Sequence, residues 1–472
     1  MYKKVFIFSD IFWIILFINI FACIKAESEA KVESEEGLLV TEINWRKIDD
    51  VGKLAEYANI RNDLGFHLAA VRQARRLLAC KKSPPYDNFI KSGIIPTLVK
   101  FLSSKNTTLQ FDSTWILAHI ASGGTEEQTA VIVEADAIPH FIRLLNSPNK
   151  EIVGQALLGL AHIINKNAEN RDKCINAGII PALIKLADSE SSNIAINQNI
   201  AWTLKNICKH QNSNNLLPIT VIQEIMPIFS NFLKSENALI LSETLMGIAN
   251  CGNGSRISRE IIINHQKIVK KVIPAFLKST NSKIQHSVLN VFKVIANGTI
   301  QQRKILLNDE ILNPMKALIK STNKHIKRDV LYIFEKIIET KNEQEINYIF
   351  DAAFIHEIVK LLKFNDYKNR INAAKIISNI SENPKIARIL IKQNVIPRLC
   401  KILKHPFEND GDIICVLKTA KNILENSGDK KSTIIEEIND AGGISLFLQF
   451  KIHRNDEVKK LTKEIIDFIN SF

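Results

Sequence analysis

The 472-residue chain has few of the residues that build turns and aromatic cores, with 17 Gly, 13 Pro and only 7% aromatic residues. A many-turned β fold needs more of them, so the shortage favours helices. The seven cysteines are scattered and include no CxxC pair. We therefore expect reduced cysteines in apolar helices, and neither a disulfide framework nor a metal site.

Catalytic signatures are also missing. The sequence has no Walker loop, GxSxG, HExxH or GxGxxG, and His356–Glu357 is an isolated pair in an amphipathic segment. No Lys/Arg run is interleaved with aromatic residues, so no nucleic-acid partner is predicted. The sequence thus predicts a protein that is not an enzyme and uses no cofactor.

What the chain does have is apolar residues, at 46%, and a formal net charge of +13. One compact core does not usually absorb so much apolar surface, so several domains or a solenoid are expected. The charge indicates either an acidic partner or simply a solvated lysine-rich surface.

The first 26 residues resemble a secretory signal peptide. Lys3 and Lys4 precede an apolar run over 5–23, interrupted by Asp10, and Ala26 offers a small residue at a cleavage point. A membrane anchor and a buried helix are the competing interpretations. Residues 27–43 are acidic and read as a linker. The folded part is expected over 44–472, and only 1–26 would contact a membrane or direct the chain to the secretory pathway or outside the cell.

A proline-containing phrase recurs about every 42 residues. It reads GIIPTLVKFL at 93–102, AIPHFIRLL at 137–145, GIIPALIKLA at 178–187, VIPAFLK at 272–278 and VIPRLCKIL at 395–403, and Pro227 and Pro314 fill two gaps. Proline suits the first turn of a helix, where its missing N–H would have no partner. The period holds two or three short helices, and stacked units of this size share one core and leave a long concave groove.

Three segments are very similar to repeats of the importin-α family: 74–96 (ARRLLACKKSPPYDNFIKSGIIP), 109–129 (LQFDSTWILAHIASGGTEEQT) and 434–450 (IIEEINDAGGISLFLQF). The resemblance covers about residues 44–472. It implies an all-α, right-handed armadillo superhelix of about ten repeats. It also implies an adaptor that binds nuclear-localisation signals in its groove for protein import into the nucleus, in cytoplasm and nucleus.

In that family, the last helix of each repeat presents Trp and Asn one turn apart, and both point the same way. The Trp rings hold the stems of signal lysines, the Asn amides bond the peptide backbone, and nearby acids bind the ammonium groups. By resemblance, the peptide-binding residues of the major site are Trp115, His119, Ser122, Gly123, Thr129, Gln155, His162, Asn199, Trp202 and Asn206, and those of the minor site are Asp329, Tyr332 and Asn379.

The sequence departs from the family where charge matters. Lys166 and Ser242 align with two major-site aspartates, and Leu158 and Leu245 align with two Trp positions. A lysine in a lysine pocket is repulsive, so binding of basic peptides is expected to be weak or absent.

The basic segment that binds importin-β in the family has no counterpart, so binding to importin-β by the usual route is not expected. The alternative function is an armadillo scaffold, secreted in one version, that has lost signal recognition and binds another, acidic protein. Lys166, Lys336 and Lys375 in the groove columns favour this alternative.

Overall fold

The computed structural model describes residues 43–471 except 61–62, 81–82, 191–192, 213 and 364–365. The predicted signal or anchor segment, 1–26, lies outside the described residues, as does the predicted linker except for its last residue. Within the described residues every regular element is a helix. None of these helices is both long and apolar enough to cross a membrane.

The chain divides into two compact units, with the boundary between Asn250 and Cys251. The first unit contains a 3₁₀ turn, η2 (Trp45–Lys47), followed by the helices α3 (Val51–Ala58), α4 (Leu64–Cys80), α5 (Tyr86–Lys91), α6 (Ile95–Phe101), α7 (Thr107–Gly123), α8 (Glu126–Glu134), α9 (Ala137–Leu144), α10 (Lys150–Lys166), α11 (Ala168–Asn176), α12 (Ile179–Ser189), α13 (Ile194–Ile207), α14 (Ile219–Phe232) and most of α15 (Ala238–Gly254).

The second unit continues with α16 (Arg256–Asn264), η3 (His265–Lys267), α17 (Ile268–Lys271), η4 (Ile273–Lys278), α18 (Ser282–Ala296), α19 (Ile300–Arg303), η5 (Lys304–Leu306), α20 (Asp309–Leu318), α21 (Lys324–Ile338), α22 (Glu343–Ile349), α23 (Ala352–Leu361), α24 (Tyr367–Ile380), α25 (Pro384–Lys392), α26 (Val395–Leu403), α27 (Asp410–Glu425), η6 (Gly428–Lys430), α28 (Lys431–Asp440), α29 (Gly443–Phe450) and α30 (Asp456–Asn470).

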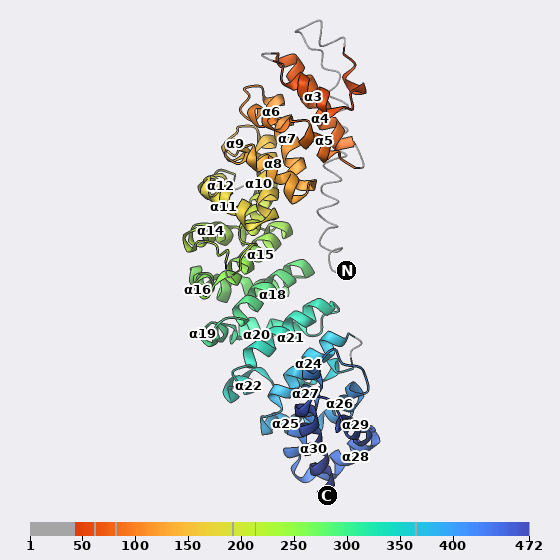
Figure 1. The fold of residues 1–472 in the computed structure, drawn as a ribbon. Helices are drawn as coiled ribbons and strands as arrows, with labels where there is room; N and C mark the ends of the chain where they lie inside the picture. Colours follow the sequence, from red (N-terminus) through yellow and green to blue (C-terminus); the bar gives the residue numbers. More distant parts are fainter. Residues whose placement is uncertain are drawn as a thin grey trace. The chain divides into compact units, whose positions relative to one another are not determined.

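The helices follow the predicted repeat, in groups of two or three that end on one long helix. In the first unit α7 packs against α4 and α10, and α10 packs against α13 (Figure 1). In the second unit α21 packs against α18 and α24, and α27 packs against α24 and α30. The predicted all-α armadillo solenoid is confirmed. Counting α3 with α4 as the first, the described helices form ten groups.

The long helices begin alike, at an Asn or Asp whose side chain accepts a hydrogen bond from a backbone N–H of the first turn. Such an N-cap contributes about 1 kcal/mol, so it fixes where each long helix starts. These caps are Asn106, Asn149, Asn193, Asn281, Asn323, Asp366, Asn409 and Asn455.

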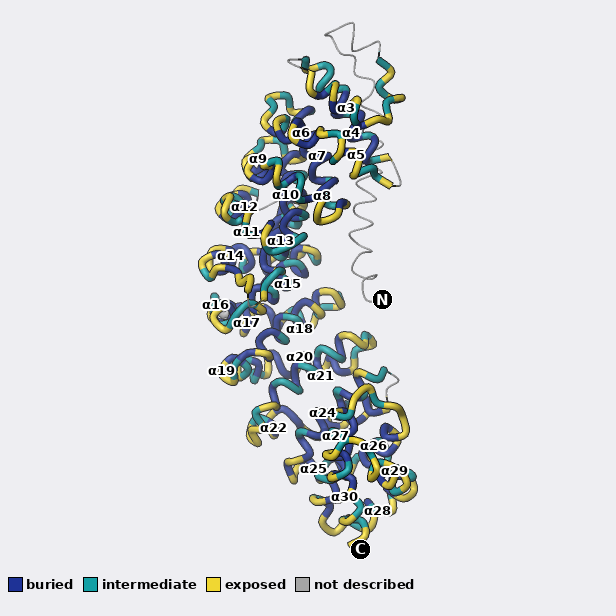
Figure 2. Tube along the Cα trace, viewed as in Figure 1, coloured by how far each residue is buried: buried dark blue, intermediate teal, exposed yellow. Residues whose placement is uncertain are grey.

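Buried residues run along the long helices, while exposed residues gather at helix ends and turns (Figure 2). Two glycines allow close packing in the first unit. A Cβ added at Gly159 would lie 3.0 Å from the Phe141 ring, and one at Gly247 would lie 2.6 Å from the Phe229 ring. The fully buried phenylalanines of α9 and α14 thus fill space left by glycines on α10 and α15.

The prolines agree with the prediction only in part. Pro96 and Pro274 lie in the first turn of α6 and η4. Pro227 and Pro314 instead lie inside α14 and α20. There the helix already runs upstream of the proline, and burial of neighbours such as Ile228 and Phe229 offsets the lost backbone hydrogen bond.

The expectation of seven reduced cysteines is wrong at Cys80, which is disulfide-bonded and lies on the exposed end of α4. Cys174, Cys208, Cys251 and Cys400 form no disulfide and are buried, as expected for core residues, and Cys415 forms no disulfide and is half-buried.

Candidate functional site

The predicted major-site residues lie on successive long helices of the first unit. Gln155 and His162 are on α10, and Asn199 and Trp202 are on α13. These four side chains are all half-buried. Because α10 and α13 pack side by side, they belong to one surface, which we call the third-helix face.

An aromatic pair forms the centre of this face. The His162 ring meets the Trp202 ring edge to face, with centroids 4.8 Å apart. The side-chain amides of Gln155 and Asn199 make no hydrogen bond to any described residue. Two uncommitted amides beside an accessible indole can bond a peptide backbone while the ring covers an aliphatic stem.

Trp115, the other predicted Trp, is buried in the core. Trp115 on α7 is only 2% exposed, and it stacks on His119 with ring centroids 4.6 Å apart. The Arg75 guanidinium lies 5.6 Å from the Trp115 ring and forms a buried ion pair of 2.5 Å with Asp112. Trp115 is thus a packed core residue in this structure, and it does not offer an open ring to a ligand.

Two more predicted residues have structural partners. Asn206 is 2% exposed, and its Nδ2 donates to the carbonyl of Ala161, 3.4 Å away, which ties α13 to α10. Thr129 on α8 is fully buried and donates to the Thr125 carbonyl. These contacts account for Asn206 and Thr129 without a ligand, and a peptide-binding role for them stays a prediction.

Tyr86 covers the carboxyl-terminal end of α7. Its hydroxyl lies 3.3 Å from Nδ1 of His119, and a Cβ added at Gly123 would fall 2.0 Å from the hydroxyl oxygen. Any residue other than glycine at 123 would therefore displace Tyr86. The neighbouring Ser122 hydroxyl is buried and has no hydrogen-bond partner among the described residues. Burial raises the pKa of Tyr86 to about 12, so the hydroxyl stays protonated.

The two histidines are neutral. Burial lowers the pKa of His119 to about 4. Burial, followed by the nearby charge of Lys166, lowers the pKa of His162 to about 3. Near neutral pH these imidazoles therefore contribute polar aromatic surface and no positive charge.

The alignment carried over to α15 is wrong by one residue. Ser242 and Leu245, which were aligned with an aspartate and a Trp of the family, are both buried. Ala249, one helical turn after Leu245, is buried as well. Asn250 donates to the carbonyl of Lys205, just before Asn206, in the way that Asn206 donates to the carbonyl just before His162.

The outward positions of α15 are therefore Glu243, Met246 and Asn250, each half-buried. Glu243 forms an ion pair with Lys205. The sequence argument missed this acid because one more residue separates α15 from α13 than the aligned phrases assumed.

Lys166 ends α10, where the resemblance expects an aspartate. Its ammonium donates to the carbonyl of Gly124 at 2.6 Å. Burial lowers the pKa of Lys166, against the opposing charge of Glu126. The predicted cation is thus present on the third-helix face, and it is held by a backbone carbonyl.

In the second unit, the predicted minor-site residues are not a set of free side chains. Asp329 on α21 accepts 2.8 Å bonds from His286 and from Lys293. The Tyr332 hydroxyl donates to Asn297 at 2.6 Å. The amide of Asn379, on α24, is half-buried and makes no hydrogen bond to a described residue.

The lysines at the predicted Trp and Asn positions of this unit are paired too. Lys336 lies 5.8 Å from the Tyr332 ring and forms an ion pair with Glu339. Lys375 pairs with Asp412 at 3.1 Å. Only Asn379 of the three predicted minor-site residues is left uncommitted. No group of side chains suited to a metal ion occurs among the described residues.

Comparison with known proteins agrees with this architecture. Residues 83–122, 125–164 and 167–209 match the family model "Armadillo/beta-catenin-like repeat". Importin subunit alpha-1b of Oryza sativa subsp. japonica is 25% identical over 423 residues, which are 86% of this chain and 76% of that protein.

Importin subunit alpha-2 of Arabidopsis thaliana is 29% identical over 204 residues, which are 43% of this chain but only 37% of that protein. An engineered protein of known crystal structure superposes with a TM-score of 0.75 at 23% identity, covering 90% of this chain and 99% of its own. This last likeness concerns the fold alone.

Proposed function

We propose that this importin-α-like armadillo-repeat protein is an adaptor that binds an extended peptide on its third-helix face. The observation that carries the proposal is the half-buried Trp202 ring, which meets neutral His162 edge to face on the same two helices as the uncommitted amides of Gln155 and Asn199. Such a surface can hold a peptide backbone and one apolar stem. An adaptor of this kind needs no catalytic group, metal or cofactor.

The first ligand to consider is a basic nuclear-localisation signal, bound for import through cytoplasm and nucleus, because importin subunits alpha are among the similar curated proteins. Trp202 and Asn199 support this version. Lys166 opposes it, because an ammonium of the signal would meet another ammonium at that position.

The second candidate is a scaffold for another protein, and a specific observation favours it. Several acids on the long helices are already paired with lysines of the chain, as in Lys205–Glu243 and Lys293–Asp329. A basic peptide would have to break these pairs before its own lysines could be bound.

Both versions can be tested by measuring binding of the full chain to an array of peptides that includes lysine-rich signals, followed by fluorescence anisotropy on the best binders. The Trp202→Ala variant should weaken binding about tenfold or more, since a stem on an indole contributes on the order of 1–2 kcal/mol. Trp202→Phe should keep part of the affinity, and Trp45→Ala, outside the face, should change nothing.

Tight binding of a lysine-rich signal would favour the import adaptor, and selection of other peptides would favour the scaffold. Equal affinity of the Trp202→Ala variant and the unchanged chain would refute the proposed site. An array without any binder would refute the adaptor.

A further inference from the structure

Several cations on the long helices are neutralised by the chain itself, through a carboxylate one repeat further on. Lys205 pairs with Glu243 in the first unit. In the second unit, Lys293 and Lys375 pair with Asp329 and Asp412, at 2.8 and 3.1 Å.

Two lysines of the first unit have no such carboxylate partner, and they lie together. The ammonium of Lys166 donates to the Gly124 carbonyl at 2.6 Å, and that of Lys209 donates to the side-chain oxygen of Asn165 at 2.7 Å. Neither forms an ion pair with any carboxylate of the described residues. Because Asn165 and Lys166 are consecutive, both ammonium groups lie at the carboxyl-terminal end of α10.

Glu126 acts on Lys166 electrostatically but forms no ion pair with either lysine. Glu126 raises the pKa of Lys166, but its carboxylate accepts the amide of Asn167 instead. Burial outweighs Glu126 and leaves the pKa of Lys166 lowered. Burial and the charge of Lys205 lower the pKa of Lys209. Lys166 is half-buried and Lys209 is exposed, and cations that have only neutral acceptors are favourable places for an anion.

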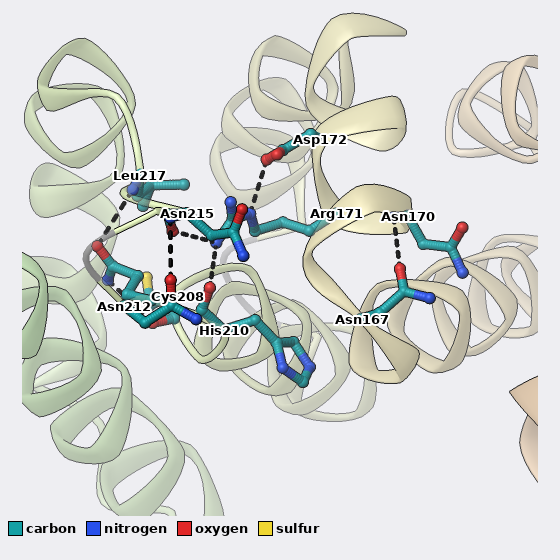
Figure 3. Close-up of polar contacts among 10 residues, drawn as sticks. Asn167, Asn170, Arg171, Asp172, Cys208, His210, Asn212, Asn215 and Leu217 are labelled. Atoms are coloured by element: carbon teal, nitrogen blue, oxygen red, sulfur yellow. Dashed lines mark hydrogen bonds and ion pairs between the residues drawn. The ribbon is translucent and has the colours of Figure 1, made fainter.

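The position of Lys209 is fixed by a buried arginine. Arg171 on α11 is fully buried and donates to the carbonyls of His210, at 2.8 Å, and Asn215, at 3.3 Å, as Figure 3 shows. The His210 ring in turn contacts the Asn165 carbonyl, with 2.9 Å between Nε2 and oxygen. Both sides of the lysine pair are therefore held in place before a ligand arrives.

We propose that Lys166 and Lys209 form a subsite for a carboxylate side chain of the bound peptide, which makes the ligand of the third-helix face an acidic peptide. Lys166 lies one helical turn beyond His162, which contacts Trp202, so one extended peptide reaches both the indole and the two ammonium groups. This inference rests on the proposed peptide-binding function and specifies its ligand.

The test compares two fluorescein-labelled peptides, GSLEVDELSG and its neutral counterpart GSLQVNQLSG, by anisotropy on the full chain at low and at moderate salt. The acidic peptide should bind about tenfold more tightly or better, with the difference shrinking as salt rises. The variant Lys166→Gln with Lys209→Gln should abolish the preference, because glutamine retains the donor and loses the charge. Lys185→Gln is the matched control, since this exposed lysine of α12 donates to Asn146 at 2.8 Å and lies on another helix.

Equal affinities for the two peptides would overturn the subsite, and so would a preference lost equally in the Lys185→Gln control. In those cases, weaker binding of both peptides by the Trp202→Ala variant would still support the adaptor function. Absence of binding by either peptide would also overturn the subsite, while the peptide array would still decide the adaptor. A single-stranded DNA competitor that bound these lysines more tightly than the acidic peptide would reassign the pair to nucleic acid. A peptide with phosphoserine in place of its glutamates would show whether phosphate is preferred to carboxylate.

Discussion

Replacing Arg171 by methionine is expected to destabilise the junction between α11 and the segment after α13 by about 3–5 kcal/mol. The guanidinium is fully buried and donates to two backbone carbonyls, those of His210 and Asn215. A hydrogen bond from a charged group contributes about 1.5–3 kcal/mol, and each carbonyl left without a donor adds a penalty. The ion pair with Asp172 adds little, because that carboxylate is 49% exposed.

Each armadillo repeat contacts mainly its neighbours, so we expect the loss of stability to be local. The midpoint of a global unfolding transition would therefore understate it. Hydrogen exchange read by mass spectrometry should show faster exchange over 208–217 and in α11. The control is Arg143→Met, because Arg143 is exposed and bonds Ser103 and His140 at the surface. A local change below about 1 kcal/mol, or one equal to that of the control, would refute the reasoning.

Three further outcomes are expected. Asn206→Ala should lower stability by about 1–2 kcal/mol by chemical denaturation, because a carbonyl of α10 loses its donor; loss of peptide affinity without loss of stability would contradict this. His119 and His162 protonate near pH 6.5 only when unfolded, so stability should be full above that pH and fall with acidification, by about 2 kcal/mol per histidine at pH 5. Gln at both positions should flatten the thermal-unfolding profile between pH 7 and 5, and an unchanged slope would count against neutral burial. Lys166→Asp with Lys205→Gln should raise affinity for a lysine-rich signal by roughly 1–3 kcal/mol in titration calorimetry; no gain would show that charge is not what limits binding.

The repeat could be predicted from the sequence because its signals are local. Prolines such as Pro96 mark helix starts, and the apolar spacing that follows them gives the face each helix buries. The resemblance to importin-α repeats indicated which helices would carry the candidate site, and Gln155, Asn199 and Trp202 lie at half-buried positions of α10 and α13.

What the sequence could not supply depends on contacts between repeats. Trp115 resembles Trp202 in its sequence context, but the Arg75 guanidinium of the neighbouring α4 lies against its ring, where it is paired with Asp112 of α7. Likewise, Glu243 rather than Ser242 faces outward on α15, because the hydrogen bonds between neighbouring long helices set the register.

Charge was the feature that the tertiary structure decided most fully. The sequence alone determined that Lys166 stands where an acid was expected and that the chain carries a net charge of +13. Only the fold shows that Lys205 is neutralised one repeat further on while Lys166 and Lys209 are not. The physical reason is that helix periodicity depends on residues close together in the sequence. Ion pairing between side chains almost 40 residues apart depends instead on how the repeats stack.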